Sequence, residues 1–250
     1  MKQLKLAALT ASIIAPLVFS SAASADTIFG IYAGAGSWEA EFSGEAGDPS
    51  VTLDDLGAKE ENNKFFYIAL EHPVPLIPNI KLQQNDINSK QTSTITQTFI
   101  LDDTEFTAGS EVASDLDLSY TDAVLYYEIL DNWFNLDIGV TARKYSGHLD
   151  AESGMATESV DVDAVIPLLY GKAQFDLPFS GLSAGIEGNY INYSDSSLMD
   201  YSAKVSYLFD SVLDLGVEVG YRAMTMTIDD DEVQTDIELS GPYAAAIFHF

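Results

Sequence analysis

The chain has 250 residues and carries 39 Asp and Glu against 11 Lys and Arg, which gives a formal net charge of −28. A polyanion of this kind repels DNA, RNA and anionic lipid surfaces, which excludes nucleic acid as a partner. The sequence contains no cysteine, which excludes disulfide bonds and thiol chemistry.

The first 25 residues predict an export signal. Two lysines lie among the first five residues, an apolar run covers 6–19, and the small residues Ala23-Ser24-Ala25 follow. This order is typical of a cleaved signal peptide, so we expect cleavage before Asp26. The mature chain would then be 26–250, with nine basic against 39 acidic residues and a charge of −30.

The mature sequence alternates in polarity with a period of two. In 215–228 the odd positions are apolar from Leu215 to Ala223, whereas the even positions include Glu218 and Arg222. The same alternation occurs in 134–143, 182–190 and 200–209, and it is typical of β-strands with one apolar face. No later stretch has 18 consecutive apolar residues, so we expect membrane contact through strands rather than helices.

Ten strands are predicted, with eight or twelve as alternatives. Their ranges are 27–42, 64–72, 79–98, 115–130, 133–148, 159–176, 182–194, 197–209, 213–228 and 234–250. The third is the weakest, because the polar residues 83–86 interrupt its apolar face. An all-β, closed, antiparallel transmembrane barrel is the expected fold.

The predicted connections differ on the two sides of the barrel. Tight turns with Pro, Gly, Asn or Asp are expected at 73–79, 131–132, 176–181 and 210–213. Longer and mostly acidic links are expected at 43–63, 99–114, 149–158 and 229–233, whereas 195–196 is short. Outer-membrane barrels have short periplasmic turns and long outer loops, so both termini are expected in the periplasm.

The end of the chain indicates the same class. Phe250, Phe248, Ala246 and Ala244 share one face, and a terminal aromatic residue of this kind resembles the signal that the bacterial barrel-assembly machinery reads. Residues 30–38, 126–133 and 240–243 resemble those of a family of uncharacterised proteobacterial outer-membrane β-barrel proteins of about 240–250 residues. The resemblance covers essentially the whole mature chain and implies a location and a fold but no activity.

Most basic residues of the mature chain fall on inward positions, as do many carboxylates. The expected charge network of the lumen consists of Glu71, Lys81, Asp122, Glu128, Asp137, Arg143, Lys172, Glu187, Asp200, Lys204, Glu218 and Arg222. In a barrel of ten strands such pairs either fill the lumen or line a narrow path for small solutes. We therefore expect a monomeric structural protein, or a narrow small-solute pore with a largely plugged lumen, in contact with outer-membrane lipid and lipopolysaccharide.

A hydrolase is the alternative from another class. His148 and Asp150 end one predicted strand, and Asp161 and Asp163 begin the next. A histidine beside carboxylates can activate water, as in omptin-type outer-membrane proteases. Both motifs carry the lipid-side parity of their strands, unless a bulge intervenes.

The predicted outer links are rich in carboxylates. They include 229–232 together with Asp54, Asp55, Glu60, Glu61, Asp102, Asp103 and Glu105. The simplest interpretation is a solvated, self-repelling surface. The alternative is weak binding of Ca²⁺ or Mg²⁺, which would bridge the protein to lipopolysaccharide phosphates. No spacing of a zinc site or a nucleotide site is present, and no other cofactor is expected.

Overall fold

The computed structural model describes residues 29–46, 50–101, 104–154, 156–194, 196–209, 214–230 and 233–250. The predicted signal peptide, 1–25, lies outside this part of the chain. Within the described residues, no helix is long and apolar enough to cross a membrane.

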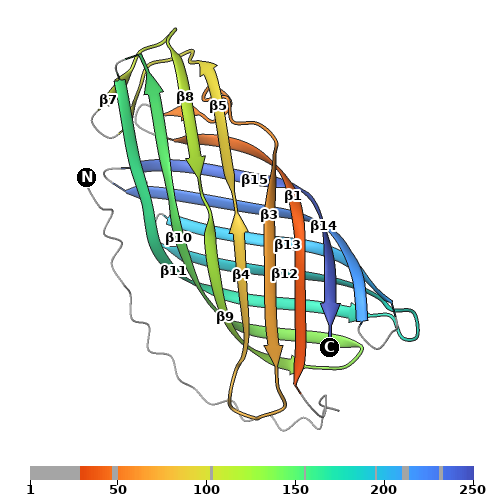
Figure 1. The fold of residues 1–250 in the computed structure, drawn as a ribbon. Helices are drawn as coiled ribbons and strands as arrows, with labels where there is room; N and C mark the ends of the chain where they lie inside the picture. Colours follow the sequence, from red (N-terminus) through yellow and green to blue (C-terminus); the bar gives the residue numbers. More distant parts are fainter. Residues whose placement is uncertain are drawn as a thin grey trace.

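Ten antiparallel strand paths form a closed barrel in the described part of the chain, which confirms the predicted all-β barrel of ten strands (Figure 1). Two of the paths are each divided into two strands. The paths are β1 (Gly30–Ala46), β3 (Glu61–Glu71), β4 with β5 (Asn79–Asp86, Asn88–Thr94), β8 with β9 (Glu111–Asp117, Tyr120–Leu130), β10 (Phe134–Ser153), β11 (Ala156–Asp176), β12 (Leu182–Tyr193), β13 (Ser196–Phe209), β14 (Asp214–Asp230) and β15 (Val233–His249).

The first and last strands close the barrel. β15 pairs with β1 from Tyr32↔His249 to Ala46↔Thr235. The backbones of Ile31 and Phe250 exchange two hydrogen bonds of 2.7 and 2.9 Å. Closure gives the first and last strands a paired neighbour on both sides, as a sheet in a nonpolar medium requires.

Two predicted acidic links are wrong. Residues 149–158 are not a loop, because β10 and β11 stay paired to Ser153↔Ala156. In 229–233, Asp229, Asp230 and Val233 belong to strands, because β14 and β15 stay paired to Asp230↔Val233. Acidic composition suggested loops here, but hydrated outward side chains are compatible with a strand that continues beyond the apolar part of the sheet. The other two long links hold β2 (Val51–Thr52), and β6 (Phe99–Leu101) with β7 (Thr104–Phe106).

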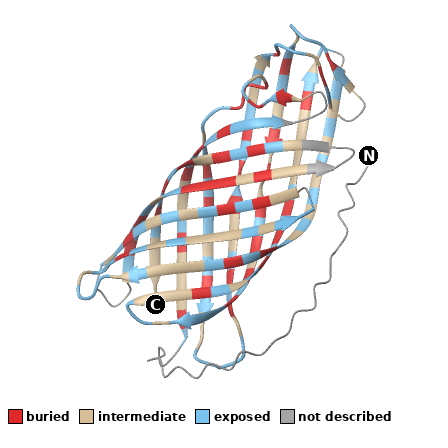
Figure 2. Ribbon diagram, turned by 180° about the vertical axis from the view of Figure 1, so that it is seen from behind, coloured by how far each residue is buried: buried red, intermediate tan, exposed pale blue. Residues whose placement is uncertain are grey.

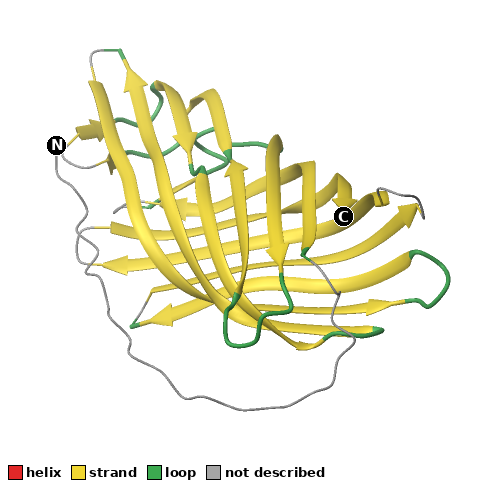
Figure 3. Cartoon of the chain, turned by 60° about the horizontal axis from the view of Figure 1, so that its bottom comes forward, coloured by secondary structure: helices red, strands yellow, loops and turns green. Residues whose placement is uncertain are grey.

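One side of the barrel is much taller than the other. β5, β8 and the upper halves of β10 and β11 form a sheet that extends past the rim, hereafter the extension (Figures 1 and 3). β12 pairs with β11 only from Tyr190↔Leu169 toward Ser183↔Asp176. The predicted third strand is divided at Ile87 into β4, which belongs to the barrel, and β5, which belongs to the extension. At this point Leu118 N–H donates to the Ile87 carbonyl at 2.9 Å.

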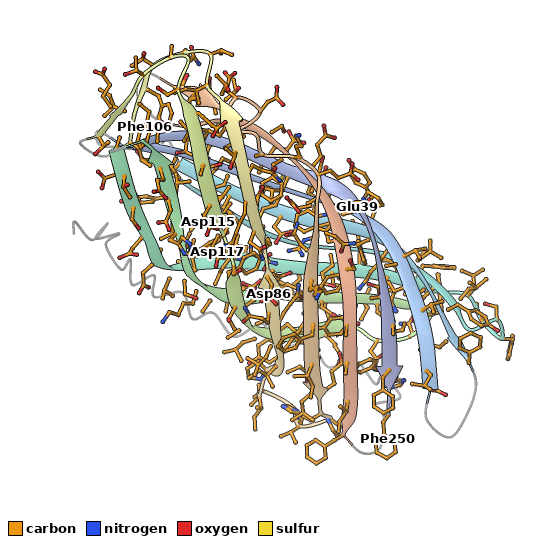
Figure 4. All side chains as sticks on the ribbon, turned by 45° about the horizontal axis from the view of Figure 1, so that its top comes forward. Glu39, Asp86, Phe106, Asp115, Asp117 and Phe250 are labelled. Atoms are coloured by element: carbon orange, nitrogen blue, oxygen red, sulfur yellow. The ribbon has the colours of Figure 1, made fainter. Side chains whose placement is uncertain are left out.

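A hydrophobic core fills the interior at the extension end. Trp38 and Phe42 of β1 pack in one cluster with Leu56 of the first long link and Phe99 and Phe106 of the β6–β7 hairpin. Phe106 and the chain end at Phe250 mark opposite ends of the molecule (Figure 4). The two long links thus cover the barrel mouth from above, and we call this cluster the apolar cap.

The outer face of the barrel is apolar in the part that lies away from the cap and the extension. Along the strands, buried and exposed residues alternate (Figure 2). Exposed apolar side chains on this face include Phe66, Ile68, Leu125, Ile138, Val140, Leu169, Ile186, Tyr201, Val205, Val217, Val219 and Tyr221. We call this band the apolar belt. Toward the extension the same outward parity carries polar residues, such as Lys144 and Ser146 on β10.

Candidate functional site

The interior of the barrel below the apolar cap is built from charged side chains in layers. Arg143 of β10 is fully buried, and its Nη2 lies 2.7 Å from Asp122 Oδ2 and 2.6 Å from Asp200 Oδ2. Its Nε also donates to Asp122 Oδ1 at 2.8 Å, so the Asp122 pair is bidentate. A bidentate guanidinium pair fixes the geometry as well as neutralising both charges.

Arg222 of β14 completes this upper layer. Its Nε and Nη2 donate to the two oxygens of Asp200 at 2.9 and 2.8 Å, and its Nη1 donates to Asn85 Oδ1 at 2.7 Å. The Tyr120 hydroxyl donates to Asp200 Oδ2 at 3.0 Å. Asp200 therefore lies between two arginines that come from strands on different sides of the barrel.

Aromatic rings cover the two guanidinium groups. The Arg143 guanidinium lies 3.7 Å from the centroid of the Tyr120 ring, and that of Arg222 lies 4.6 Å from the centroid of the Trp38 ring. Such stacking is most favourable where water is excluded. The upper layer is thus joined to the underside of the apolar cap.

A middle layer follows toward the chain ends. Glu187 of β12 lies 2.5 Å from Lys81 Nζ and 3.2 Å from Lys204 Nζ. Lys204 also lies 3.2 Å from Glu218, which accepts a hydrogen bond of 2.9 Å from the Tyr243 hydroxyl. The four charges alternate around the lumen, so each has at least one opposite neighbour.

The lowest layer is less completely paired. Lys172 Nζ lies 3.1 Å from Asp137 Oδ2, and Asp137 is 1% exposed. Tyr126 donates to Glu71 at 2.6 Å, and Asn79 donates to Glu128 at 3.0 Å. Among the described residues neither oxygen of Asp137 has a hydrogen-bond partner, so the ion pair with Lys172 is the contact that compensates this buried carboxylate. This layer is net acidic and lies at the end of the barrel that carries the chain terminus.

Only a small space remains between the upper and middle layers. A polar cavity of about 50 Å³ is lined by the charged residues of the upper and middle layers together with Tyr67, Asn189, Ser202 and Tyr243. A space of this size holds a few water molecules at most. Within the described residues, side chains of the upper and middle layers therefore fill most of this cavity's surroundings.

The sequence identified the charged residues of the lumen but not their partners. Lys204 contacts both Glu187 and Glu218, and Arg222 binds Asp200 of the neighbouring strand. Arg222 faces Ser202 in the strand register, so Asp200 is two residues along the neighbouring strand. The height of each charged side chain along the barrel axis depends on the tilt of the strands, which the alternation of polarity does not determine.

Four uncharged members of the network were not predicted. Tyr120 has the inward parity of Asp122 and Asn85 has that of Lys81, so parity would have found both. Trp38 and Tyr243 also lie inward, and both are buried. Searching the inward positions for hydrogen-bonding aromatic residues would have extended the predicted network.

The residues of the hydrolase hypothesis lie elsewhere, on the outer face of the extension. His148 and Asp150 point outward from β10, and His148 faces Asp161 of β11 in the register. Asp163 faces Ser146. His148 Nε2 lies 3.8 Å from Asp150 Oδ2 and 3.7 Å from Asp115 Oδ2 of β8. These side chains are brought together on a sheet face rather than across the barrel mouth.

The remaining histidines lie near the other end of the barrel. His249 stacks on Tyr32 with ring centroids 4.1 Å apart, and His72 Nδ1 accepts a hydrogen bond of 3.3 Å from the Val74 N–H in a turn. Both contacts are of the kind that stabilise local structure.

No protein-family model matches the chain, and no curated protein matches it. The function is therefore inferred from the geometry of the barrel and its lumen.

Proposed function

We propose that the protein is an outer-membrane barrel that spans the bilayer through the apolar belt, with a lumen closed by ion pairs. The observation that carries this proposal is the combination of an apolar outer face with a charged interior on the same strands. In a water-soluble barrel the two faces would have the opposite character.

The length of the apolar belt supports a membrane location. On β14 the outward apolar positions run from Leu215 to Ala223, and on β13 they run from Tyr201 to Phe209, nine residues in each case. A transmembrane β-strand of about 9–11 tilted residues crosses the hydrocarbon core. Outward aromatic residues occur at both limits, such as Phe209 and Tyr201, where interfacial rings are preferred.

The proposed orientation follows from the connections. The chain end lies at one end of the belt, whereas the extension and the two long links that carry the cap lie at the other. Outer-membrane barrels carry their long loops on the outside, so the extension would face the cell exterior. Phe250, 63% exposed at the end of the closing pair, would be available to the assembly machinery.

A structural role fits the lumen better than an open pore. The upper layer joins Asp122, Arg143, Asp200 and Arg222 in continuous contact across the barrel. Moving an ion through it would require separation of buried pairs, each of which is costly to break. The proposed resting state is therefore non-conducting, and a narrow small-solute path would need a rearrangement of this layer.

Single-channel recording of the refolded protein in planar bilayers tests the proposal. The wild-type protein should insert, shown by heat-modifiable migration on gels, and should give no stable conductance. Arg222→Ala should open a small conductance, because it removes a guanidinium that fills the lumen and leaves Asp200 with one arginine.

Two results would contradict the proposal. A stable conductance of the wild-type protein would favour the narrow-pore alternative. Failure of the correctly folded protein to associate with lipid vesicles would remove the membrane location itself.

The geometry does not favour the hydrolase alternative. His148, Asp150, Asp161 and Asp163 lie on the outward face of the extension, where β10 is paired with both β8 and β11. Water activation in a hydrolase requires a position where substrate and catalytic groups converge in a concave site.

A further inference from the structure

Three side chains on the outer face of the extension converge in a way that the lumen and the belt do not explain. Asp115 of β8 is the register partner of Asp150 of β10, and His148 lies two residues before Asp150 on the same strand. Residues two apart on a strand share a face. All three side chains therefore point to one side of the extension, beyond the polar end of the apolar belt.

We propose that Asp115, His148 and Asp150 form a binding site for a divalent transition-metal ion of the Zn²⁺ class. One ligand atom from each residue lies within 4.8 Å of the other two. Nε2 of His148 is 3.7 Å from Asp115 Oδ2 and 3.8 Å from Asp150 Oδ2.

The two separations from His148 are close to those of a metal site, whereas the ligand atoms of Asp115 and Asp150 lie within 4.8 Å and would have to approach further. With metal–ligand bonds of about 2.0–2.1 Å and tetrahedral angles, ligand atoms lie about 3.4 Å apart. The two distances from His148 need to shorten by only a few tenths of an ångström. The side chains of Asp115, His148 and Asp150 are 25%, 36% and 47% exposed, so small rotations are possible and an ion can enter from solution.

The donor set determines the class of ion. Ca²⁺ and Mg²⁺ are bound by oxygen atoms, whereas a neutral imidazole suits Zn²⁺, Cu²⁺ and Ni²⁺. With one imidazole and two carboxylates, three protein ligands leave a fourth position for water, as in open zinc sites. The site therefore differs from the weak Ca²⁺ or Mg²⁺ binding considered for the acidic links.

Two further features favour this arrangement. The Ser159 hydroxyl donates to Asp150 Oδ1 at 2.6 Å. This hydrogen bond orients the Asp150 carboxylate and leaves its Oδ2 free to bind a metal ion on the side of His148. Asp115 Oδ1 is buried and has no hydrogen-bond partner among the described residues. A buried carboxylate oxygen without a donor gains from a nearby cation.

The neighbouring charges concentrate cations at the site. His148 faces Asp117 of β8 on one side and Asp161 of β11 on the other in the register. Asp115 and Asp117 lie close together along β8 in Figure 4. Clustered carboxylates raise the local concentration of counter-ions.

One basic residue competes with the metal. Lys90 Nζ lies 2.5 Å from Asp115 Oδ2, the atom that would bind the ion. A metal must displace the Lys90 contact, and removal of Lys90 should therefore strengthen binding.

The proposal can be tested with Zn²⁺ and the full-length protein refolded in detergent, titrated against a chromophoric zinc chelator. One Zn²⁺ per chain should bind. His148→Ala should weaken binding at least tenfold, and Lys90→Met should strengthen it several-fold. His72→Ala, a histidine in a turn near the other end of the barrel, is the matched control and should leave the affinity unchanged. Heat-modifiable gel migration verifies that each variant is folded.

Two results would overturn the site. If His148→Ala binds Zn²⁺ as well as the wild type does, the imidazole is not a ligand. If a hundredfold excess of Ca²⁺ displaces Zn²⁺ from the wild type, the ion is held by a diffuse acidic surface rather than by this triplet. Weakening on removal of Lys90 would likewise contradict the proposed competition.

Discussion

At the scale of single residues, Arg143 shows how this barrel tolerates charge in its interior. The side chain is fully buried, and removal of a guanidinium from water is costly unless opposite charges and hydrogen bonds compensate. Asp122 and Asp200 supply that compensation on two sides, and the Tyr120 ring covers the third. The middle layer repeats the pairing with lysines and glutamates, whereas the lowest layer is less completely paired.

Replacement of Arg143 by Met should destabilise the protein by about 3–5 kcal/mol, because Asp122 would be left buried without its bidentate partner. The matched control is Lys144→Met. Lys144 is the next residue and is also basic, but it points outward and is exposed. The free energy of unfolding, measured by urea titration in lipid vesicles with tryptophan fluorescence, should fall for Arg143→Met alone. Similar losses in both variants would show that the buried pair is not what stabilises this strand.

Glu60 provides a prediction about pH at the outer end. A hydrogen bond with Glu39 and the repulsion between the two carboxyls raise the pKa of Glu60 above its usual value of 4.5. The folded state therefore holds this proton more tightly than the unfolded state does, so the contribution of Glu60 to stability is lost as the pH rises through the raised value. Glu39 projects from β1 in Figure 4.

Glu60→Gln should accordingly stabilise the protein at neutral pH and flatten the dependence of the melting temperature on pH above 4.5. Glu105→Gln on β7 serves as a control for the loss of one surface charge. A melting curve of Glu60→Gln that has the same pH dependence as the wild type would contradict the proposed coupling with Glu39.

At the scale of the strands, each long element has two parts with different surroundings. The part of β14 from Leu215 to Ala223 is outwardly apolar, whereas Thr225 and Thr227 continue the same face with polar side chains. β10 changes in the same way, from Val140 to Lys144. The change in polarity occurs without a break in pairing, so one strand serves both the proposed membrane zone and the solvated zone.

Val219→Arg and Thr225→Arg test this division on one strand and one face. Val219 lies inside the apolar belt, and an arginine there should cost about 2–4 kcal/mol near the middle of the bilayer. Thr225 lies six residues further, about 20 Å along the strand, where an arginine meets water and Glu238. Folded yield and urea midpoint in vesicles should fall for Val219→Arg and stay near the wild-type value for Thr225→Arg. A larger loss of folded yield and urea midpoint for Thr225→Arg than for Val219→Arg would contradict the proposed position of the apolar belt in the membrane.

Much of the element level could be predicted from the sequence, because alternation fixes both the strand and the direction of each side chain. The uniformly apolar face from Leu215 to Ala223 gave the right strand, and parity placed Glu218 and Arg222 on the same side of it. The extension could not be predicted in this way. Asp150 and Glu152 continue a strand, yet acidic residues in sequence are equally typical of a loop.

The alternation of polarity also could not predict the apolar cap or the partners of the ion pairs. Phe99 and Phe106 lie between predicted strands, and only the folded chain shows that they pack with Trp38 over the mouth. Arg222 meets Asp200 because the strands are tilted, and the tilt depends on how ten strands close rather than on any one of them. Global closure thus determines the contacts of the lumen, whereas local pattern determines which residues are available.

At the scale of the whole molecule, three zones follow one another along the barrel. The lowest contains the net acidic layer around Asp137, the middle contains the closed ion-pair layers, and the upper contains the apolar cap with the extension. The proposed membrane zone surrounds the charged layers, so the most polar interior lies where the exterior is most apolar. The proposed membrane outside the barrel and the packed side chains inside it limit the access of water to the ion pairs, and a lower local dielectric constant strengthens them.

Insertion of a short epitope tag at each end of the molecule tests the proposed orientation. Gly154 is at the tip of the β10–β11 hairpin with φ of +62° and open space around it, so an insertion there should not disturb the barrel. Asn132 lies in the tight turn between β9 and β10 at the opposite end. In intact bacteria that express the protein, an antibody should bind the tag after Gly154 and should bind the tag after Asn132 only once the outer membrane is permeabilised. Heat-modifiable migration of both variants shows that each has folded. Labelling of the Asn132 tag on intact cells would reverse the barrel, and labelling of neither tag before permeabilisation would place the protein away from the cell surface. Either result would also move the His148 site from the exterior to the periplasm, where its access to metal ions from the medium would differ.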